Sequence, residues 1–236
     1  MRVLVVGDRG DSDPGYVGER LEELGAELTL ALRGELKVDG PLPDAGRADL
    51  VVLLGSADGV ADAGRDDVVA VESALVLDCL DRDVPVMAIC YGAQLAAAAL
   101  GGTVTKGGAH ELGWYYVESH DPALCPPGPW VQYHDDWFTV PDGARLTGVS
   151  DAGPQGFAVE APDGRLRLVA WQFHPEVSPA ILERWLSADA EPLARQEVDV
   201  AALMGETRER AEHARAATHA LVDVALDAMG LVRARV

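Results

Sequence analysis

The sequence predicts a doubly wound α/β protein of the flavodoxin-like kind, with a mostly parallel central sheet, added antiparallel strands and a C-terminal helical tail. Three short apolar runs, at residues 2–6, 48–55 and 84–90, are each followed by a helix-length amphipathic segment. This alternation is typical of βα units on a parallel sheet that is buried on both faces. The first half of the chain therefore favours parallel strands with helices on both sides.

The second half has a different pattern. From residue 102 onward, turns rich in Pro, Gly and Asp separate strand-like runs, with no helical pattern between them. Such runs predict antiparallel strands added to the sheet. Ser178 and Pro179 then supply an N-cap and a proline at the first helical position, which predicts a helix over "AILERWLSADA".

The last stretch, from about residue 191, contains no strand pattern. A stripe of mostly small residues recurs there at helical spacing: Ala214, Ala217, Leu221, Val224 and Ala228. Such a stripe permits close packing. We therefore expect a helical extension that packs either on the domain or on a second subunit as a homo-oligomer contact.

Composition limits the partners of this protein. Its 39 acidic residues outnumber its 19 basic ones, giving a formal charge of -20, so the surface should repel phosphate backbones and anionic membranes. No apolar run reaches the roughly 20 residues that cross a bilayer. The N-terminal run stops at Gly7 and Asp8, too early for a signal peptide. We expect a cytoplasmic protein that binds neither nucleic acid nor membrane.

Cysteine usage and loop motifs exclude several kinds of site. The three cysteines, Cys79, Cys90 and Cys125, form no CxxC pair, so neither a disulfide framework nor a structural zinc site is indicated. The chain also has no GxGxxG or phosphate-binding loop. We therefore expect no nucleotide or other cofactor.

Cys90 stands where a strand-like run becomes a helix-like one. At the C-terminal edge of a parallel sheet, a sharp strand-to-helix step pushes one side chain out of the backbone path. The N-terminus of the following helix favours a thiolate. Small residues two positions away on either side, Ala88 and Gly92, suit such a crowded turn. The alternative is that Cys90 is an ordinary buried residue.

A second stretch, "VAWQFHPEV", places His174 and Glu176 directly after a strand, with Pro175 fixing the turn between them. An imidazole can accept a thiol proton, and a carboxylate can hold that imidazole in the right tautomer. His134, Asp136, His174 and Glu176 could instead be metal ligands. The proline beside His174 and the fit to a Cys-His-Glu triad disfavour that alternative, so no metal is expected.

The two motifs together carry a family resemblance. "AICYGAQLAAAALGG" followed by "QFHPEV" resembles the class I glutamine amidotransferases, most closely the amidotransferase domain of GMP synthase and its stand-alone relatives. Weaker matches lie in "VVLLGS", "ELGW" and "YHDDWFTVP". The resemblance implies an amidotransferase domain over residues 1–190 and a helical extension over residues 191–236.

The resemblance also implies the roles of individual residues. Cys90 corresponds to the nucleophile, His174 to the general base and then acid, and Glu176 to the partner that orients the imidazole. Gly55 and Gln94 correspond to residues that line the substrate pocket.

Backbone N–H groups of Ser56 and Tyr91 correspond to the donors of the oxyanion hole. "LLGSAD" stands where the family has Ser-Gly-Gly-Pro, which leaves open whether the hole is preformed. The segment "QYHDDWF" aligns with a family segment that holds the amino-acid end of glutamine, which points to Tyr133, Asp135 and Asp136. An ordinary acidic surface turn is the alternative for this segment.

The function implied is hydrolysis of the side-chain amide of L-glutamine through a cysteine thioester, giving glutamate and ammonia for a separate acceptor synthetase. The stretch after residue 190 is too short for an acceptor domain, so that partner is expected on another polypeptide. Two alternatives remain: a hydrolase of γ-glutamyl amides or peptides, and a non-catalytic binding module. The complete set of Cys90, His174 and Glu176 counts against the second.

Overall fold

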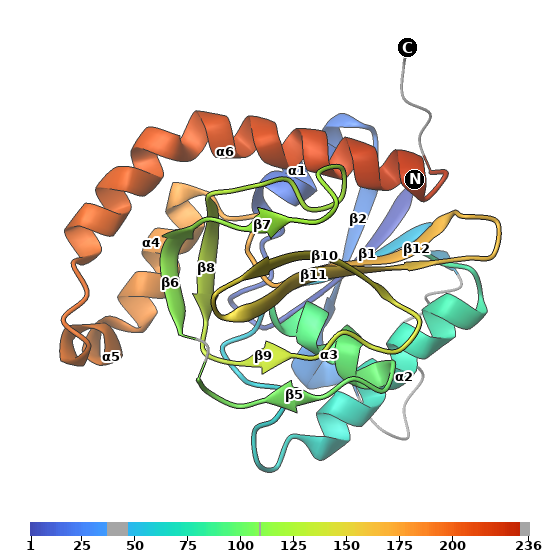
Figure 1. Ribbon diagram of the computed structural model, residues 1–236, viewed down its shortest axis with the longest axis horizontal. Helices are drawn as coiled ribbons and strands as arrows, with labels where there is room; N and C mark the ends of the chain where they lie inside the picture. The colour runs from blue at the N-terminus through green and yellow to red at the C-terminus, as the bar shows by residue number, and fades with distance from the viewer. Residues whose placement is uncertain (37–46, 109, 232–236) are drawn as a thin grey trace.

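The computed structural model describes residues 1–36, 47–108 and 110–231, and its centre is an eight-stranded sheet (Figure 1). The strands of this sheet are β1 (Arg2–Gly7), β2 (Glu27–Leu32), β3 (Leu50–Leu53), β4 (Val86–Ile89), β7 (Glu118–Ser119), β10 (Arg145–Ser150), β11 (Gly153–Glu160) and β12 (Leu166–Trp171). Their order is β2-β1-β3-β4-β12-β11-β10-β7. The first five strands run parallel, and β11, β10 and β7 extend the sheet beyond β12, each paired antiparallel with its neighbour. The predicted fold class is confirmed.

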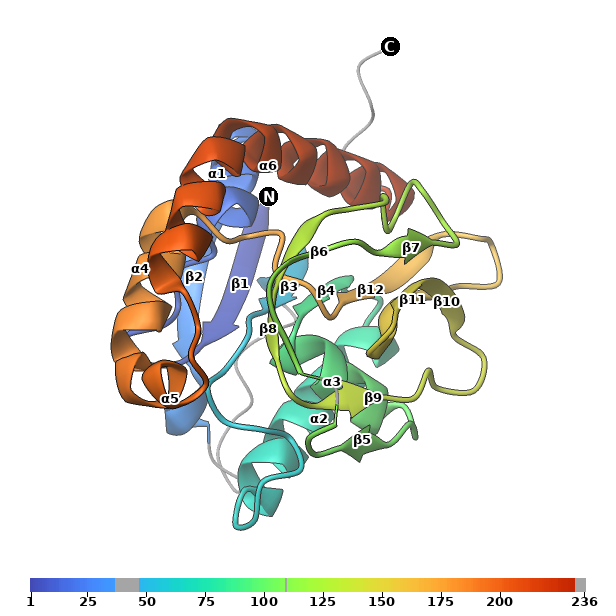
Figure 2. The ribbon, with the colours of Figure 1, turned by 60° about the vertical axis from the view of Figure 1, so that its left-hand side comes forward.

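Helices cover both faces of the sheet. They are α1 (Gly15–Glu23), α2 (Asp66–Asp81), α3 (Tyr91–Ala99), α4 (Pro179–Ala188), α5 (Ala190–Arg195) and α6 (Val200–Ala228), with a short 3-10 helix η1 (Arg33–Glu35) after β2. Helices α1 and α6 lie on one face, and α2 and α3 lie on the other (Figures 1 and 2).

The apolar runs of the parallel strands follow from this layering. In β1, Val3 and Val5 pack into the cluster under α1 and α6, while Leu4 and Val6 pack into the cluster under α2 and α3. All four side chains are buried. A strand covered on both faces has no solvent side, so its sequence shows continuous apolar residues instead of alternation.

Two antiparallel ribbons stand beside the main sheet. One pairs β5 (Val104–Thr105) with β9 (Trp137–Phe138), and the other pairs β6 (Glu111–Tyr115) with β8 (Trp130–His134). A third apolar cluster joins β8 to α4, α5 and α6 through Val131, Leu182, Leu193 and Met204. This cluster brings the loop between β8 and β9 to the C-terminal ends of the parallel strands.

Helix α4 begins as its sequence predicts. The Ser178 hydroxyl accepts a hydrogen bond from the Ile181 N–H at 3.3 Å, and Pro179 is the first helical residue. The serine therefore satisfies one of the N–H groups that have no acceptor within the first helical turn.

Helix α6 packs on the domain along most of the predicted stripe: Ala214 and Leu221 are buried, Ala217 and Ala228 are partly buried against the core, and Val224 is the exception. Leu221, Val222, Ala225 and Leu226 are fully or almost fully buried, whereas Val224 is 40% exposed. On a helix of about 3.6 residues per turn, these four buried residues share one side, and Val224 falls just outside it. Assigning Val224 to the packed face was wrong for this reason.

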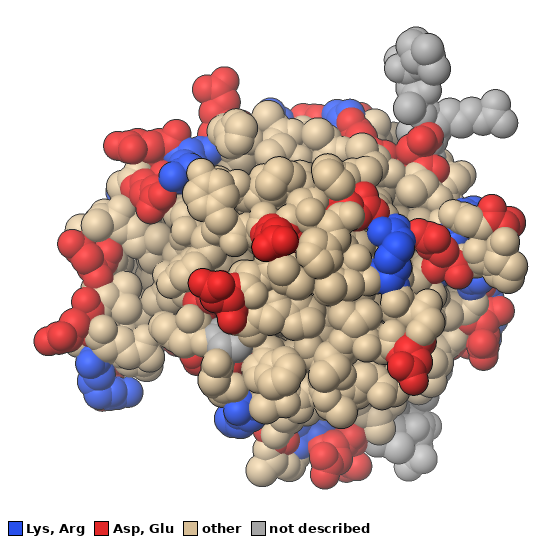
Figure 3. All heavy atoms as spheres, in the orientation of Figure 1, with Lys and Arg blue, Asp and Glu red and all other residues tan. Residues whose placement is uncertain are grey.

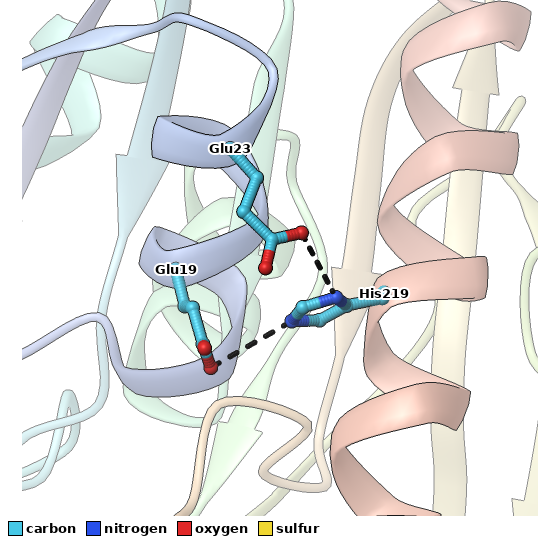
Figure 4. Close-up of side chains that lie close together, drawn as sticks. All are labelled: Glu19, Glu23 and His219. Carbon is cyan, nitrogen blue, oxygen red and sulfur yellow. Dashed lines mark ion pairs between the residues drawn. The ribbon is translucent and has the colours of Figure 1, made fainter.

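Ion pairs also join α6 to α1 (Figure 4). His219 of α6 lies between Glu19 and Glu23 of α1, at 3.7 Å and 3.5 Å. Arg215, one turn earlier, donates hydrogen bonds to the same two carboxylates at 2.6 Å and 2.8 Å. Glu19, Glu23 and His219 have a spacing that suits a metal ion, but the Arg215 guanidinium already supplies positive charge next to the two carboxylates.

Charge is spread unevenly over the face seen in Figure 1. Uncharged side chains cover most of its centre, over the antiparallel strands, while acidic and basic side chains gather mainly toward its rim (Figure 3). Within the described ranges, no helix combines the length and the apolar character needed to span a bilayer.

Replacing Leu226 by Ala tests the packing of α6. We expect a loss of about 2 to 5 kcal/mol in the free energy of unfolding, because the side chain is fully buried and its removal leaves a cavity. The matched control is Val224→Ala, which should change stability by no more than about 0.5 kcal/mol. Urea unfolding measures both variants. Equal small losses would contradict the packing of α6 described above.

Candidate active site

Cys90 occupies a forced turn between β4 and α3. Its φ of 50° and ψ of −107° lie in a region that residues with a side chain rarely adopt. Its N–H donates to the carbonyl of Trp171 at 2.7 Å, and its own carbonyl accepts from the N–H of Gln94 at 3.0 Å. These bonds hold the backbone on both sides of the turn, so the thiol projects from the end of the strand.

Two glycines allow this turn to lie against β3 and the loop that follows it. A Cβ at Gly92 would stand 2.5 Å from the carbonyl oxygen of Leu53, so no side chain fits there. A Cβ at Gly55 would stand 3.1 Å from Cε1 of His174 and 3.7 Å from Cβ of Cys90. The loop after β3 therefore passes directly beside both the thiol and the imidazole.

His174 and Glu176 form a buried pair. Nδ1 of His174 lies 2.7 Å from Oε1 of Glu176, and both side chains are almost completely shielded from solvent. The His174 N–H donates to the carbonyl of Val131 at 2.8 Å, and the ring of Trp185 meets the imidazole edge-on at 4.8 Å. The imidazole is therefore fixed by its partner, its backbone and its neighbour.

The backbone of the His-Pro-Glu turn is held from two other helices. The Tyr16 N–H at the start of α1 donates to the carbonyl of Glu176 at 2.9 Å. Gly15 lies so close that a Cβ on it would be 1.9 Å from the same oxygen. Thr218 of α6 donates its hydroxyl to the carbonyl of Pro175 at 2.6 Å. The turn is thus tied to both ends of the chain.

The electrostatics of the pair favour the imidazolium. Burial opposes protonation of His174, but the charges of Glu176 and Cys90 more than offset it, so the pKa of His174 is raised well above its usual range. Nε2, which Glu176 does not use, has no hydrogen-bond partner among the described residues. Gln172 donates to the Cys90 sulfur at 3.6 Å. The charge on the Cys90 sulfur therefore affects the protonation of His174.

A cleft of about 770 Å³ opens over these residues at the C-terminal ends of the parallel strands. Glu176 lies behind His174 and is not part of its wall. The other residues predicted for the site all line it, namely Gly55, Ser56, Cys90, Tyr91, Gln94, Tyr133, Asp135, Asp136 and His174. The structure thus brings together segments that are far apart in the sequence.

The Gln94 and Asp136 side chains bind protein groups at the wall of the cleft. Gln94 donates to the carbonyl of Asp136 at 3.3 Å and to Oε1 of Gln172 at 3.2 Å. The Asp136 carboxylate accepts from the N–H of Gly107 at 2.8 Å. These bonds fix the loop after β8 next to α3.

Tyr133 and Asp135 lie further out. The Tyr133 hydroxyl donates to Asp189 at 2.6 Å, which ties β8 to the junction of α4 and α5. Asp135 is exposed and stands 2.5 Å from Nδ1 of His110, another residue of the cleft wall. The loop after β8 is therefore both exposed at the surface, at Asp135, and part of the cleft wall.

The two histidines considered as metal ligands lie in separate pairs, and the Asp136 carboxylate is in neither. Nε2 of His134 lies 3.1 Å from Glu111, and both side chains are buried. His174 pairs with Glu176 instead. Each imidazole thus has its own carboxylate.

The other two thiols lie outside the cleft. Cys79 and Cys125 are fully buried, and burial raises the pKa of each to about 12. Thiols of this kind stay protonated and unreactive at neutral pH.

Sequence reasoning missed several residues of the site. Trp185 contacts His174, and Gln172 contacts Cys90. Arg33 and Glu72 form a buried ion pair beneath the loop after β3. Only Glu72 gave a signal, because it continues the apolar stripe of α2 that includes Leu75, Val76 and Cys79. A charged residue on such a stripe needs a buried partner.

The chain matches the family model "Glutamine amidotransferase class-I" over residues 11–188. The chain belongs to the class I glutamine amidotransferases. A solved structure of a glutamine amidotransferase from Thermotoga maritima has a TM-score of 0.82 with 26% identity, covering 96% of this chain and 98% of that chain.

Among curated proteins, a GMP synthase (glutamine-hydrolyzing) of Bartonella henselae is 30% identical over 189 residues, or 74% of this chain. One of Thermus thermophilus is 32% identical over 222 residues, or 89% of this chain. The matched segments are 33% and 41% of those proteins, so this amidotransferase spans well under half the length of the relatives that it matches.

Replacing Glu176 by Gln tests the electrostatics of the pair. The change removes the carboxylate charge that raises the pKa of His174 and leaves burial, which lowers it. We therefore expect the His174 ring to titrate at lower pH, as followed by NMR of the imidazole protons. Glu160→Gln, which removes an exposed carboxylate that pairs with Arg145, is the control and should leave the titration unchanged. An unaltered His174 titration in Glu176→Gln would contradict the coupling.

Proposed function

We propose that this amidotransferase hydrolyses the side-chain amide of L-glutamine to glutamate and ammonia, with Cys90, His174 and Glu176 as its catalytic residues. The observation that carries the proposal is the meeting of a thiol at a forced turn with a buried, carboxylate-held imidazole, in a cleft that also contains the Ser56 and Tyr91 backbone. Nucleophile, base and orienting acid are the parts that acyl transfer through a thioester requires.

In the first half of the reaction, the Cys90 thiolate attacks the carboxamide carbon of glutamine. The carbonyl oxygen becomes an oxyanion, which the N–H groups of Ser56 and Tyr91 stabilise. Tyr91 is the first residue of α3, where an N–H group has no acceptor within the helix. The His174 imidazolium donates its proton to the amide nitrogen of the substrate, and the C–N bond breaks. Ammonia departs, and a γ-glutamyl thioester remains on Cys90.

In the second half, His174, now neutral, removes a proton from water. The resulting hydroxide attacks the thioester carbon and forms a second oxyanion at the same two N–H groups. The C–S bond then breaks, the product leaves as glutamate after its new γ-carboxyl group loses a proton to solvent, and the thiolate and imidazolium are restored. Glu176 keeps Nδ1 of His174 protonated throughout, so that Nε2 exchanges the proton.

We further propose that a synthetase takes up the ammonia, because the relatives named GMP synthase join glutamine hydrolysis to a synthase in one protein. Five residues of the cleft wall are proposed to contact the substrate: Gly55, Gln94, Tyr133, Asp135 and Asp136. The amidotransferase domain is proposed to span residues 1–190, and the helices after residue 190 form an extension to it.

One observation favours a second candidate substrate. The cleft of about 770 Å³ is within the range that holds drug-sized ligands, and it continues from Cys90 to Trp185, Asp189 and Leu193 of α4 and α5. Glutamine, which has ten heavy atoms, fills only part of such a space. A γ-glutamyl amide with a larger amine as leaving group would use the same thioester chemistry.

Glutamate release from L-glutamine by the purified chain tests the proposed function. We expect turnover that falls by about four orders of magnitude in Cys90→Ala, because the nucleophile of a triad contributes at least that much to kcat. Cys125→Ala removes a thiol that does not line the cleft and is the matched control. A chloroketone analogue of glutamine should label Cys90, as detected by mass spectrometry.

The outcomes separate the alternatives. Labelling of Cys90 without turnover would indicate that hydrolysis needs the synthetase. Faster release of glutamate from γ-glutamyl anilide than from glutamine would favour the larger substrate. The absence of both Cys90 labelling and turnover of every γ-glutamyl compound tested would reject the proposal in favour of a non-catalytic module.

A further inference from the structure

A buried arginine lies beneath the loop that follows β3. Arg33 is only 1% exposed, and its guanidinium binds four groups. It donates to Glu72 at 2.6 Å and to Asp8 at 2.6 Å, and also to two backbone carbonyls, those of Leu54 at 3.0 Å and Gly55 at 3.3 Å. The two carbonyls immediately precede the N–H groups of Gly55 and Ser56.

The same ion pair contacts the other segment of the oxyanion hole. The Arg33 guanidinium lies 4.5 Å from the centre of the Tyr91 ring, and the Tyr91 hydroxyl donates to the second oxygen of Glu72 at 2.7 Å. Burial, and then the charge of Glu72, raise the pKa of Tyr91, so its hydroxyl remains a donor. One pair of charges thus contacts Tyr91 itself and the carbonyl of the peptide that joins Gly55 to Ser56, and the N–H groups of Tyr91 and Ser56 are the two assigned to the oxyanion.

The carbonyl of Gly55 determines where the next N–H points. The described residues contain no cis peptide bond, and across a trans peptide the C=O and the N–H point to opposite sides. Because the Gly55 carbonyl faces the buried Arg33, the Ser56 N–H faces away from it, toward the cleft that both residues line. Flipping this peptide would remove an acceptor from a buried guanidinium, which is costly.

Local backbone preference does not fix this peptide. Neither Gly55 nor Ser56 has a positive φ, and within the turn the Ser56 hydroxyl accepts a hydrogen bond from the Asp58 N–H at 3.1 Å. The rigid fork of a guanidinium, by contrast, holds several acceptors in fixed relative positions. Packing alone does not require this pair, since apolar residues of similar volume often replace a buried ion pair without loss of stability.

We propose that Arg33 and Glu72 are positioning residues that keep the Ser56 and Tyr91 N–H groups directed at the oxyanion, so that the hole is formed before substrate binds. This inference rests on the proposed glutamine hydrolysis. Neither side chain touches the substrate; both act through the backbone of the loop after β3 and through the Tyr91 ring.

The double variant Arg33→Met/Glu72→Leu tests the inference, because it removes both charges together and leaves neither one buried alone. We expect kcat for L-glutamine to fall about a hundredfold to a thousandfold, the range found when one oxyanion donor is lost, with KM nearly unchanged. Arg33→Lys should lose a similar factor, because one ammonium cannot bridge the same carbonyls and carboxylates. Arg82→Met, at an exposed ion pair of the α2 C-terminus, is the matched control and should keep full activity.

A second readout separates positioning from general damage. Iodoacetamide alkylates a thiolate by displacing iodide from an sp³ carbon and develops no oxyanion. Its rate of reaction with Cys90 should therefore stay within about twofold of wild type while glutamine turnover falls. Parallel losses of alkylation and turnover would mean that the pair merely supports the fold, and would overturn the inference.

Tyr91→Phe keeps the ring and removes only the bond to Glu72, so it provides a folded variant if the double variant does not fold. It should lower kcat less than Arg33→Lys does, again at unchanged alkylation. Full activity in both single variants would also overturn the inference while leaving the proposed function intact. A wild-type chain that neither turns over glutamine nor reacts with the chloroketone would instead defeat the proposed function and this inference with it.

Discussion

The positive φ of Cys90 is the constraint on which the rest of the site depends. A cysteine reaches this conformation only because the surroundings fix it: the N–H is bound by β12, the carbonyl by α3, and Gly92 lets the helix rest on the end of β3. The turn then points the sulfur at the end of β12, where the chain continues into His174. Parallel pairing of β4 with β12 thus brings Cys90 and His174 to the same end of the sheet although they lie far apart in the sequence.

The layers on either side of the sheet serve this turn in different ways. Helix α2 and the short η1 supply the charges beneath the loop after β3, and α1 and α6 hold the His-Pro-Glu turn through Tyr16 and Thr218. The two faces of the fold therefore support different parts of the site, the loop after β3 on one side and the His-Pro-Glu turn on the other. The acidic surface of the protein contributes little to this, since the groups concerned are buried.

Much of this architecture follows from local sequence. The βα alternation, the cap at Ser178 and the two motifs around Cys90 and His174 predict the fold and the main site residues, because each is encoded within a few neighbouring positions. The phase of α6 and the role of Arg33 could not be predicted in this way. Val224 and Leu226 are both apolar, and only the supporting surface decides which is buried, while Arg33 stands in a segment with no pattern of its own.

The bond from Thr218 to the carbonyl of Pro175 gives α6 a further consequence. Because α6 also buries Leu226 against the sheet and pairs with α1, it cannot detach without releasing the backbone between His174 and Glu176. We therefore expect α6 and the His-Pro-Glu turn to behave as one cooperative unit in hydrogen exchange, with protection that rises and falls together. A ligand that stiffens the cleft would slow exchange along a helix that it never touches.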